Sequence, residues 1–414
     1  MITDLGRRSL VVLALALTAV ASACSSGSDG ATPTTTQTTP ASTSTTTTTL
    51  LAEELATDAD FYTVPAPLPA GDHGTLLRFQ EVSPSVTEGA TTFRIMYLSE
   101  SLEGEPIAVT GTALVPDIAA PDTGRELLTI AHGTTGIADE CAPSKQPGSE
   151  LLLMRDQVAA GRLVAMTDYE GLGTPGRHPY LVGESEGRGV LDAIRAAGAL
   201  PGADPGDRLA IAGYSQGGHG ALWANQIAED WAPEFDVVGT FAGAPATEMQ
   251  VILRAAPAGF QFLMVAGFEA AYPEADPATF LTPEAMPRLS AVDEGCARDV
   301  FGAVSDIPRG QVVLPTAFDE GPWADLADAN DPGNVITDEP ILVIHSEADD
   351  VVPLTLSKFL LDRMCQVDQV VERRILTDGD GHGAAAPPAY RLGLTWLADR
   401  FGTDPAEPVS SCPS

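Results

Sequence analysis

The chain has 414 residues, and its 57 Asp and Glu against 22 Lys and Arg give a formal net charge of −35. This excess of negative charge repels nucleic acid, so it disfavours a phosphate-binding surface and fits an exported protein better than one steered to anionic lipid. The length of the chain after residue 60 suits one large domain, or a core with an inserted cap. None of these features indicates a reaction.

The first 23 residues predict an export signal. Two arginines precede an apolar run from Leu10 to Ala21, which is much shorter than the roughly 20 residues needed to cross a bilayer. The small residues directly before Cys24 resemble a bacterial lipobox, in which the cysteine is lipidated and holds the protein at a membrane. Ordinary cleavage after Ala23 is the alternative. We therefore expect an exported, extracytoplasmic protein that is either a cell-envelope lipoprotein or secreted.

Residues 24–60 are expected to form a flexible tether. Most of this stretch is Ser, Thr, Pro and Gly, with few large apolar side chains. It cannot bury enough surface to offset the entropy of ordering.

The folded part opens with β-rich runs and continues with alternating strands and helices. Three runs, 75–82, 92–99 and 107–115, are expected to pair antiparallel. The strands expected next are 126–131, 162–167 and 209–212, separated by helices over 149–160 and 188–199. This alternation implies parallel pairing with right-handed crossovers, and a reactive site at the carboxyl ends of the strands.

The segment Gly213-Tyr214-Ser215-Gln216-Gly217 lies between an apolar strand and a helix expected over 221–229. Glycines leave room for a strained turn that exposes the serine hydroxyl above a sheet, as in the nucleophile elbow of an α/β-hydrolase. A loop serine without function is the alternative. We expect an α/β-hydrolase fold, with a mostly parallel sheet flanked by helices and Ser215 as the nucleophile.

A serine nucleophile needs a base to accept its proton. Among the six histidines, His382 follows a strand expected over 370–376 and precedes the last helix, expected over 389–400, which is where this fold carries its base. Of the other five, His73 precedes the sheet, His178 lies in a Gly/Pro loop with no fixed relation to the serine, and His219 lies one helical turn beyond it. His132 and His345 each end a strand and are expected to be local hydrogen-bonding groups.

The base in turn needs a carboxylate from the chain between serine and histidine. An apolar strand over 340–345 is followed by an acidic segment, from which we choose Asp349, with Asp350 second and Glu347 third. A solvated acidic turn is the alternative reading. The oxyanion hole is expected to use the backbone NH of Gln216 and that of Thr135, with Thr134 second, in a loop of small residues.

The remaining features concern the cap and the cysteines. Residues 247–335 lie between the helix after Ser215 and the strand before Asp349, where a bare core needs only one strand and one helix. We therefore expect the excess to form a mainly helical cap or lid, with the core formed by 61–246 and 336–414. Its apolar helices, expected over 251–256, 259–271 and 280–289, could line an acyl-chain pocket or simply form the core of the cap. Four cysteines besides Cys24 suggest two disulfides, with three possible connectivities and no pair spaced as metal ligands.

Several segments together resemble the secretory lipase (LIP) family. They are His132-Gly133-Thr134-Thr135-Gly136, Cys141-Ala142-Pro143-Ser144, Thr167-Asp168-Tyr169-Glu170-Gly171-Leu172-Gly173, His178-Pro179-Tyr180 and Gly213-Tyr214-Ser215-Gln216-Gly217-Gly218. The resemblance implies cleavage of lipid or other carboxylic esters by Ser215, Asp349 and His382, without a metal or organic cofactor. It also implies disulfides Cys141–Cys296 and Cys365–Cys412. One departure is Ser346, where the family more often has Gly.

The sequence thus predicts an exported serine hydrolase that cleaves carboxylic esters, in the first place a lipase. The alternatives are a short-chain carboxylesterase, a peptidase or acyltransferase with the same triad, and a tethered binding module. The expected partners are an ester substrate and, if Cys24 is modified, a membrane, with no nucleic acid.

Overall fold

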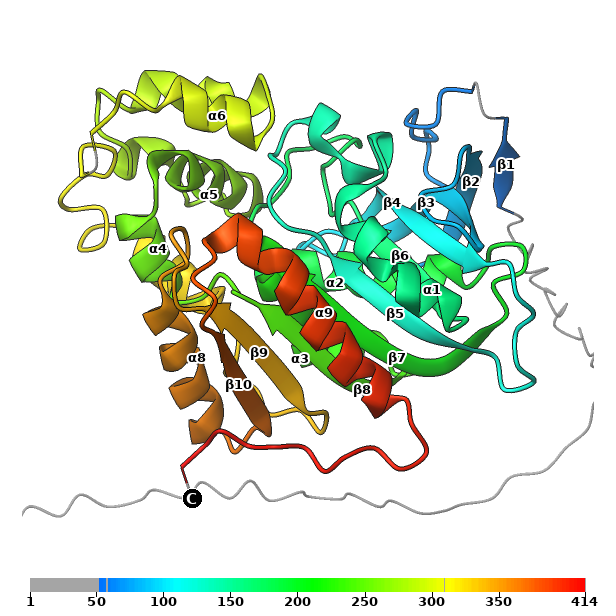
Figure 1. Cartoon of the computed structure of the whole chain (residues 1–414). Helices are drawn as coiled ribbons and strands as arrows, with labels where there is room; N and C mark the ends of the chain where they lie inside the picture. Colours follow the sequence, from blue (N-terminus) through cyan, green and yellow to red (C-terminus); the bar gives the residue numbers. More distant parts are fainter. Residues whose placement is uncertain (1–51, 57–58, 309, 414) are drawn as a thin grey trace, which may run out of the picture. The chain divides into compact units, whose positions relative to one another are not determined.

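A ten-stranded sheet runs through the part of the chain that the computed structural model describes, residues 52–56, 59–308 and 310–413 (Figure 1). The strand order is β1-β2-β3-β4-β6-β5-β7-β8-β9-β10. Their bounds are Glu53–Leu55 (β1), Leu76–Val82 (β2), Ala90–Glu100 (β3), Pro106–Pro116 (β4), Arg125–Ala131 (β5), Leu163–Thr167 (β6), Pro205–Tyr214 (β7), Asp236–Gly243 (β8), Ile341–Ser346 (β9) and Val371–Leu376 (β10).

The pairing directions follow the prediction. β2, β3 and β4 pair antiparallel, β4 also pairs antiparallel with β6, and every neighbouring pair from β6 to β10 is parallel. β6 and β9 are buried at every position, as expected for strands that are covered on both faces. The α/β-hydrolase fold predicted from the sequence is therefore present.

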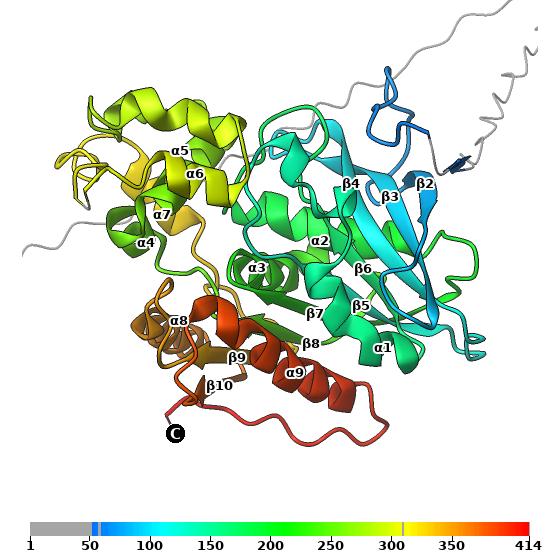
Figure 2. The same cartoon turned by 45° about the horizontal axis from the view of Figure 1, so that its top comes forward.

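Helices cover both faces of the sheet, as Figures 1 and 2 show. One apolar core lies between the sheet and α2 (Gly183–Ala197) and α3 (Gln216–Trp231). A second core lies on the other face, under α1 (Arg155–Ala159) and α9 (His382–Arg400), and α8 (Leu354–Gln366) packs on β9 and α3. Short 3₁₀ turns, η1 (Asp139–Cys141), η2 (Pro143–Lys145) and η3 (Ser149–Met154), follow β5.

Several element ends differ from the prediction. The helix expected over 149–160 is a 3₁₀ turn in its first half, and α3 begins at Gln216 rather than at Ala221. α9 begins at His382, seven residues before the predicted start, although it contains Pro387 and Pro388. The sequence does not reveal where these two helices begin, because the first turn of α3 is rich in glycine and the early part of α9 contains two prolines. Packing against the sheet outweighs this low helix propensity.

The start of the fold also lies earlier than predicted. Residues 53–55, which the sequence analysis assigns to the tether, form β1 and pair parallel with β2. The side chain of Arg78 on β2 contacts Glu53 at 3.2 Å, and Gln80 Nε2 donates to the Ala56 carbonyl at 2.6 Å. The predicted export signal and Cys24 lie outside the described residues. Among the described residues, no helix has the length and apolarity needed to cross a membrane.

The segment between β8 and β9, residues 247–335, is mainly helical, and we call it the cap. It contains α4 (Met249–Ala255), α5 (Ala258–Ala271), α6 (Ala297–Ala303) and α7 (Trp323–Ala329), with 3₁₀ turns η4 (Pro277–Thr279) and η5 (Met286–Asp293). Its own core includes Phe262, Phe268, Phe280 and Trp323, all fully buried. The prediction of a helix over 280–289 is wrong in its first half, because Leu281 pairs with Val313 in a β-bridge and the 3₁₀ turn η5 begins only at Met286.

Candidate active site

Ser215 occupies the turn between β7 and α3 at the carboxyl end of the sheet. Its backbone has φ 61° and ψ −120°, a conformation that a non-glycine residue adopts only when its surroundings impose it. The flanking glycines are required for close approach. A Cβ at Gly217 would lie 1.9 Å from the Ala131 carbonyl oxygen, and one at Gly213 would lie 2.0 Å from that of Gly217.

The structure brings together the three side chains that the sequence analysis selects. His382 Nε2 lies 2.9 Å from Ser215 Oγ, and His382 Nδ1 lies 2.7 Å from Asp349 Oδ2. Because the carboxylate can only accept, Nδ1 carries the proton and Nε2 is free to accept from the serine hydroxyl. The arrangement can transfer a proton from serine to histidine while the carboxylate stabilises the resulting imidazolium.

His382 is the first residue of α9 rather than part of a separate loop, which corrects the prediction. Asp350 fixes this helix start, because its Oδ1 accepts the backbone NH of His382 at 2.9 Å. The hydroxyl of Tyr214 donates to the His382 carbonyl at 2.7 Å. The histidine is therefore held through its backbone from both the acid loop and the nucleophile strand.

Asp349 is the only one of the three candidate acids that contacts the histidine side chain. Its side chain is fully buried, and its Oδ1 accepts the NH groups of Val351 and Val352 at 2.9 and 2.8 Å. Burial opposes ionisation, but the hydrogen bonds with His345 and His382 outweigh it and hold the pKa of Asp349 below its usual range. Glu347 is exposed.

Ser346, the residue that departs from the family pattern, has a visible role. Its Oγ donates to the Asp380 carbonyl at 2.5 Å and accepts the NH of Ala348 at 3.2 Å. The first bond joins the end of β9 to the turn that precedes α9. The hydroxyl thus links the acid loop to the histidine loop.

Of the expected oxyanion donors, Gln216 follows the serine directly and Thr135 lines the same pocket. Gln216 is the first residue of α3, so its backbone NH has no partner within the helix. Thr134 and Thr135 lie in the loop after β5 that lines the same pocket as Ser215 and His382. The Thr135 carbonyl accepts the NH of Ala297 from the cap at 2.8 Å, which fixes this part of the loop.

The pocket has a volume of about 810 Å³ and combines core and cap residues. Its cap side is formed by Phe260, Phe301 and the segment Cys296–Arg298. An apolar pocket with a few convergent polar groups is the usual form of a small-molecule site.

Two residues of the site were missed by sequence reasoning. Glu150 lines the pocket, and its carboxylate oxygens accept the NH of Gly133 at 3.3 and 3.2 Å. Burial raises the pKa of Glu150 to about 7, against the opposing effect of that hydrogen bond. No motif marks Glu150, because a glutamate in a helical segment is ordinary.

His178 is the second, and here the prediction of no fixed relation to Ser215 is wrong. Its Nε2 lies 3.0 Å from Nε2 of Gln216, the residue directly after the serine. Of the two histidines expected to have local roles, His132 contacts the Gly133 carbonyl, and His345 contacts the Val352 carbonyl and lies 3.4 Å from Asp349 Oδ2. His219 contacts Glu186 and the Asn330 carbonyl, and His73 contacts Asp192.

Two disulfides join Cys141 to Cys296 and Cys365 to Cys412, the pairs that the family resemblance implies. The first connects the loop after β5 with the cap. Within residues 52–56, 59–308 and 310–413, no group of three or more His, Cys, Asp or Glu side chains is placed to hold a metal ion.

The fold is shared with solved hydrolases. Lipase A of Candida antarctica in its closed state is similar with a TM-score of 0.70 and 21% identity, over 86% of this chain and 89% of that one. The esterase LipA of Xanthomonas oryzae has a TM-score of 0.61 and 19% identity, over 78% of this chain and 96% of the esterase.

Curated relatives carry lipase names. A protein of Mycobacterium tuberculosis named "Probable inactive lipase MT1628" is 25% identical over 85% of this chain and 83% of its own length. "Secreted triacylglycerol lipase LIP4" of Malassezia globosa is 25% identical over 75% of this chain and 71% of its own length. The model of the family described as "Secretory lipase" matches residues 144–408. Fold and family match agree, and the chain belongs to the secretory lipase family of α/β-hydrolases.

Proposed function

We propose that this protein is an exported serine hydrolase that cleaves carboxylic esters of lipids through Ser215, His382 and Asp349. The observation that carries the proposal is the hydrogen-bonded chain from Ser215 Oγ to His382 Nε2 (2.9 Å) and from His382 Nδ1 to Asp349 Oδ2 (2.7 Å). These hydrogen bonds lie at the carboxyl ends of the parallel strands, in a pocket whose volume can hold an ester.

The steps follow from the geometry. Ser215 Oγ attacks the ester carbonyl carbon while its proton passes to His382 Nε2, and Asp349 stabilises the imidazolium. The NH groups of Gln216 and Thr135 hold the negative charge on the former carbonyl oxygen. The alcohol leaves with the proton from His382, and water then attacks the acyl-enzyme, gives its proton to His382 and releases the carboxylic acid.

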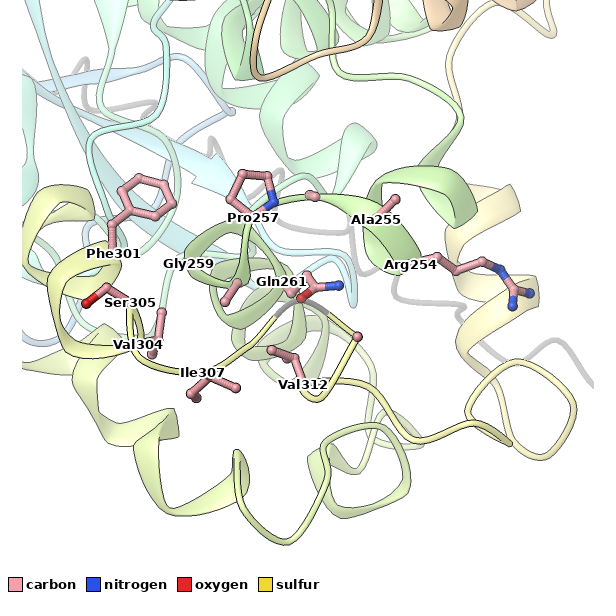
Figure 3. Close-up of a pocket in the computed structure, with 13 residues that line it drawn as sticks. Arg254, Ala255, Pro257, Gly259, Gln261, Phe301, Val304, Ser305, Ile307 and Val312 are labelled. Atoms are coloured by element: carbon pink, nitrogen blue, oxygen red, sulfur yellow. The ribbon is translucent and has the colours of Figure 1, made fainter.

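The aromatic lining of the pocket favours a substrate with an apolar acyl group. Phe260 and Phe301 of the cap face the catalytic pocket, with ring centroids 4.7 Å apart in an edge-to-face arrangement. Phe301 also lines a second cavity of about 290 Å³ inside the cap, which Figure 3 shows with Phe301 at one end and Arg254 at the other. The proposed acyl site therefore borders further space within the cap, lined mainly by apolar side chains.

A mycobacterial relative is named as a probable inactive lipase. This chain retains nucleophile, base and acid in hydrogen-bonded contact. That retention supports an active enzyme over the alternative of a tethered binding module.

The test is hydrolysis of p-nitrophenyl esters from acetate to palmitate, with emulsified triglyceride alongside, by protein without its N-terminal tether. Activity on long chains and triglyceride would establish a lipase, and activity on short chains alone would establish the alternative, a carboxylesterase. No activity on any ester would refute the proposal and favour a peptidase, an acyltransferase or a binding module. Ser215→Ala is the control and should abolish turnover without loss of the fold.

Export and anchoring form a separate part of the proposal, supported by the signal-like N-terminus and the family. Intact-mass analysis of the membrane fraction tests it. An acylated Cys24 would establish a cell-envelope lipoprotein, whereas an unmodified Cys24 would rule out the anchor.

A further inference from the structure

The connection between β6 and α2, residues 168–182, contacts Gln216, which follows Ser215, and Thr134 in the loop after β5. Three of its rings form a group: Tyr169 stacks on His178 with centroids 5.4 Å apart and planes 8° apart, and His178 meets Tyr180 edge to face at 6.1 Å. His178 is fully buried and Tyr180 is 2% exposed. No step of the proposed mechanism uses these side chains.

On the side of α3, His178 holds Gln216. The Glu170 carbonyl lies 2.9 Å from His178 Nδ1 and can only accept, so the proton resides on Nδ1 and Nε2 is an acceptor. Nε2 accepts one hydrogen of the Gln216 side-chain amide at 3.0 Å, and Glu186 accepts the other at 2.9 Å. The side chain of Gln216 is thus fixed by both of its amide hydrogens. Burial lowers the pKa of His178 to about 3, which keeps it neutral and able to accept.

On the side of the oxyanion loop, Tyr180 holds Thr134. Its hydroxyl shares a hydrogen bond of 2.7 Å with Thr134 Oγ1. The Thr134 residue supplies the carbonyl half of the peptide whose NH belongs to Thr135, so restraining Thr134 restrains that NH. The Tyr169 hydroxyl donates to the carbonyl of His132 at 3.0 Å, at the start of the same loop.

We infer that His178 and Tyr180 are positioning residues of the oxyanion hole, the first acting through Gln216 and the second through Thr134. This inference rests on the proposed function. Donors aimed in advance at the developing charge stabilise a transition state more than a substrate. Loss of either contact should therefore lower kcat and leave KM nearly unchanged.

The experiment compares Tyr180→Phe and His178→Phe with the unmodified protein. Tyr180→Phe removes only a hydroxyl, and His178→Phe keeps a ring to stack on Tyr169 while it removes the acceptor. Each should lower kcat by about tenfold, well short of the 10²- to 10³-fold that loss of an oxyanion donor itself costs. KM should stay within about twofold, and the affinity for an alkylboronic acid, which forms a tetrahedral adduct with an activated serine, should fall as kcat does.

Tyr272→Phe is the matched control, since Tyr272 is a cap tyrosine whose hydroxyl accepts from Asn330 Nδ2 at 2.9 Å, and it does not line the catalytic pocket. It should leave kcat unchanged. Unchanged kcat in both Tyr180→Phe and His178→Phe would overturn the inference, and so would an equal loss in Tyr272→Phe. Neither result touches the proposed function, which fails only if the unmodified protein does not turn over esters.

Discussion

Asp349 and Asp350 are adjacent acids that contact the same histidine through different atoms. Asp349 accepts from the imidazole of His382, and Asp350 accepts from its backbone NH. Asp349→Asn should lower kcat by about 10³- to 10⁴-fold, because an amide can donate to Nδ1 and favour the wrong tautomer.

Asp350→Asn should lower kcat by less than about tenfold, because its side chain retains an oxygen that can cap α9. Steady-state kinetics with p-nitrophenyl butyrate separates the two. Equal losses, or a larger loss for Asp350→Asn, would contradict the assignment of the acid.

Glu150 predicts a pH dependence of stability. Burial raises its pKa from 4.5 to about 7, so the folded chain binds this proton more tightly than the unfolded chain. The contribution of Glu150 to stability is full below pH 4.5 and is lost as the pH rises through 7. The unfolding free energy of the unmodified protein relative to Glu150→Gln should therefore fall with pH, by no more than about 3 kcal/mol.

Denaturant unfolding of both proteins at about pH 5 and about pH 8 measures this difference, and taking the difference cancels other titrating groups such as Asp168. A difference that is the same at both pH values would show that Glu150 does not titrate between them.

At the scale of elements, the two disulfides are expected to differ in function. Cys141–Cys296 joins η1, in the segment after β5, to the cap, where Gly136 pairs with Cys296 and the Thr135 carbonyl accepts the NH of Ala297. Cys365–Cys412 ties the end of α8 to the C-terminal segment, away from the pocket.

Replacing either pair with serine should cost about 2–4 kcal/mol of unfolding free energy. Only the Cys141→Ser/Cys296→Ser protein should also lose kcat, at temperatures where both variants are folded. Thermal unfolding and kinetics on the two double variants test this. Full kcat in the first variant would show that the loop keeps its geometry without the cap bond.

Phe301 of α6 lines both the pocket that contains Ser215 and the cavity inside the cap. The Phe301 ring packs directly against Gly259 of α5. A Cβ at Gly259 would lie 1.8 Å from Phe301 Cδ1, so the close packing of α5 and α6 depends on that glycine. Phe301→Ala should join the two spaces and raise kcat/KM for palmitate over butyrate esters severalfold. Phe318→Ala, which removes a cap ring that lines neither space, should leave the ratio unchanged. An unchanged ratio in Phe301→Ala would mean that acyl chains do not reach this wall.

The sequence predicts most elements and the direction of their pairing, because alternation of strand and helix carries that information. It does not predict where α3 and α9 begin, because Gly217, Gly218, Pro387 and Pro388 have poor helix propensity and only tertiary packing selects the helix there. His382 could be selected from its order after Ser215, but its place on the first turn of α9 could not.

The same limit applies around the site. The contacts of His178 with Gln216 and of Glu150 with Gly133 join residues that are 38 and 17 positions apart, across elements whose mutual placement no local pattern encodes. Asp168, which belongs to one of the segments that resemble the family, forms hydrogen bonds within the core. Its carboxylate accepts from the NH of Ser144 at 2.8 Å and from Thr110 Oγ1 at 2.7 Å.

At the scale of the whole molecule, the end of the parallel sheet, residues 247–335 and the Cys141–Cys296 disulfide border the pocket that contains Ser215. The formal net charge of −35 favours solubility and does not select a substrate. The central claim is that Ser215 is activated by His382 and Asp349.

The most direct test is titration of the unmodified protein and of Ser215→Ala with a fluorophosphonate, followed by intact and peptide mass spectrometry. We predict one phosphonyl adduct per chain, located on Ser215, with esterase activity lost in proportion to labelling and no adduct on Ser215→Ala. An unlabelled Ser215 in folded protein, or equal labelling of Ser215→Ala, would contradict the account.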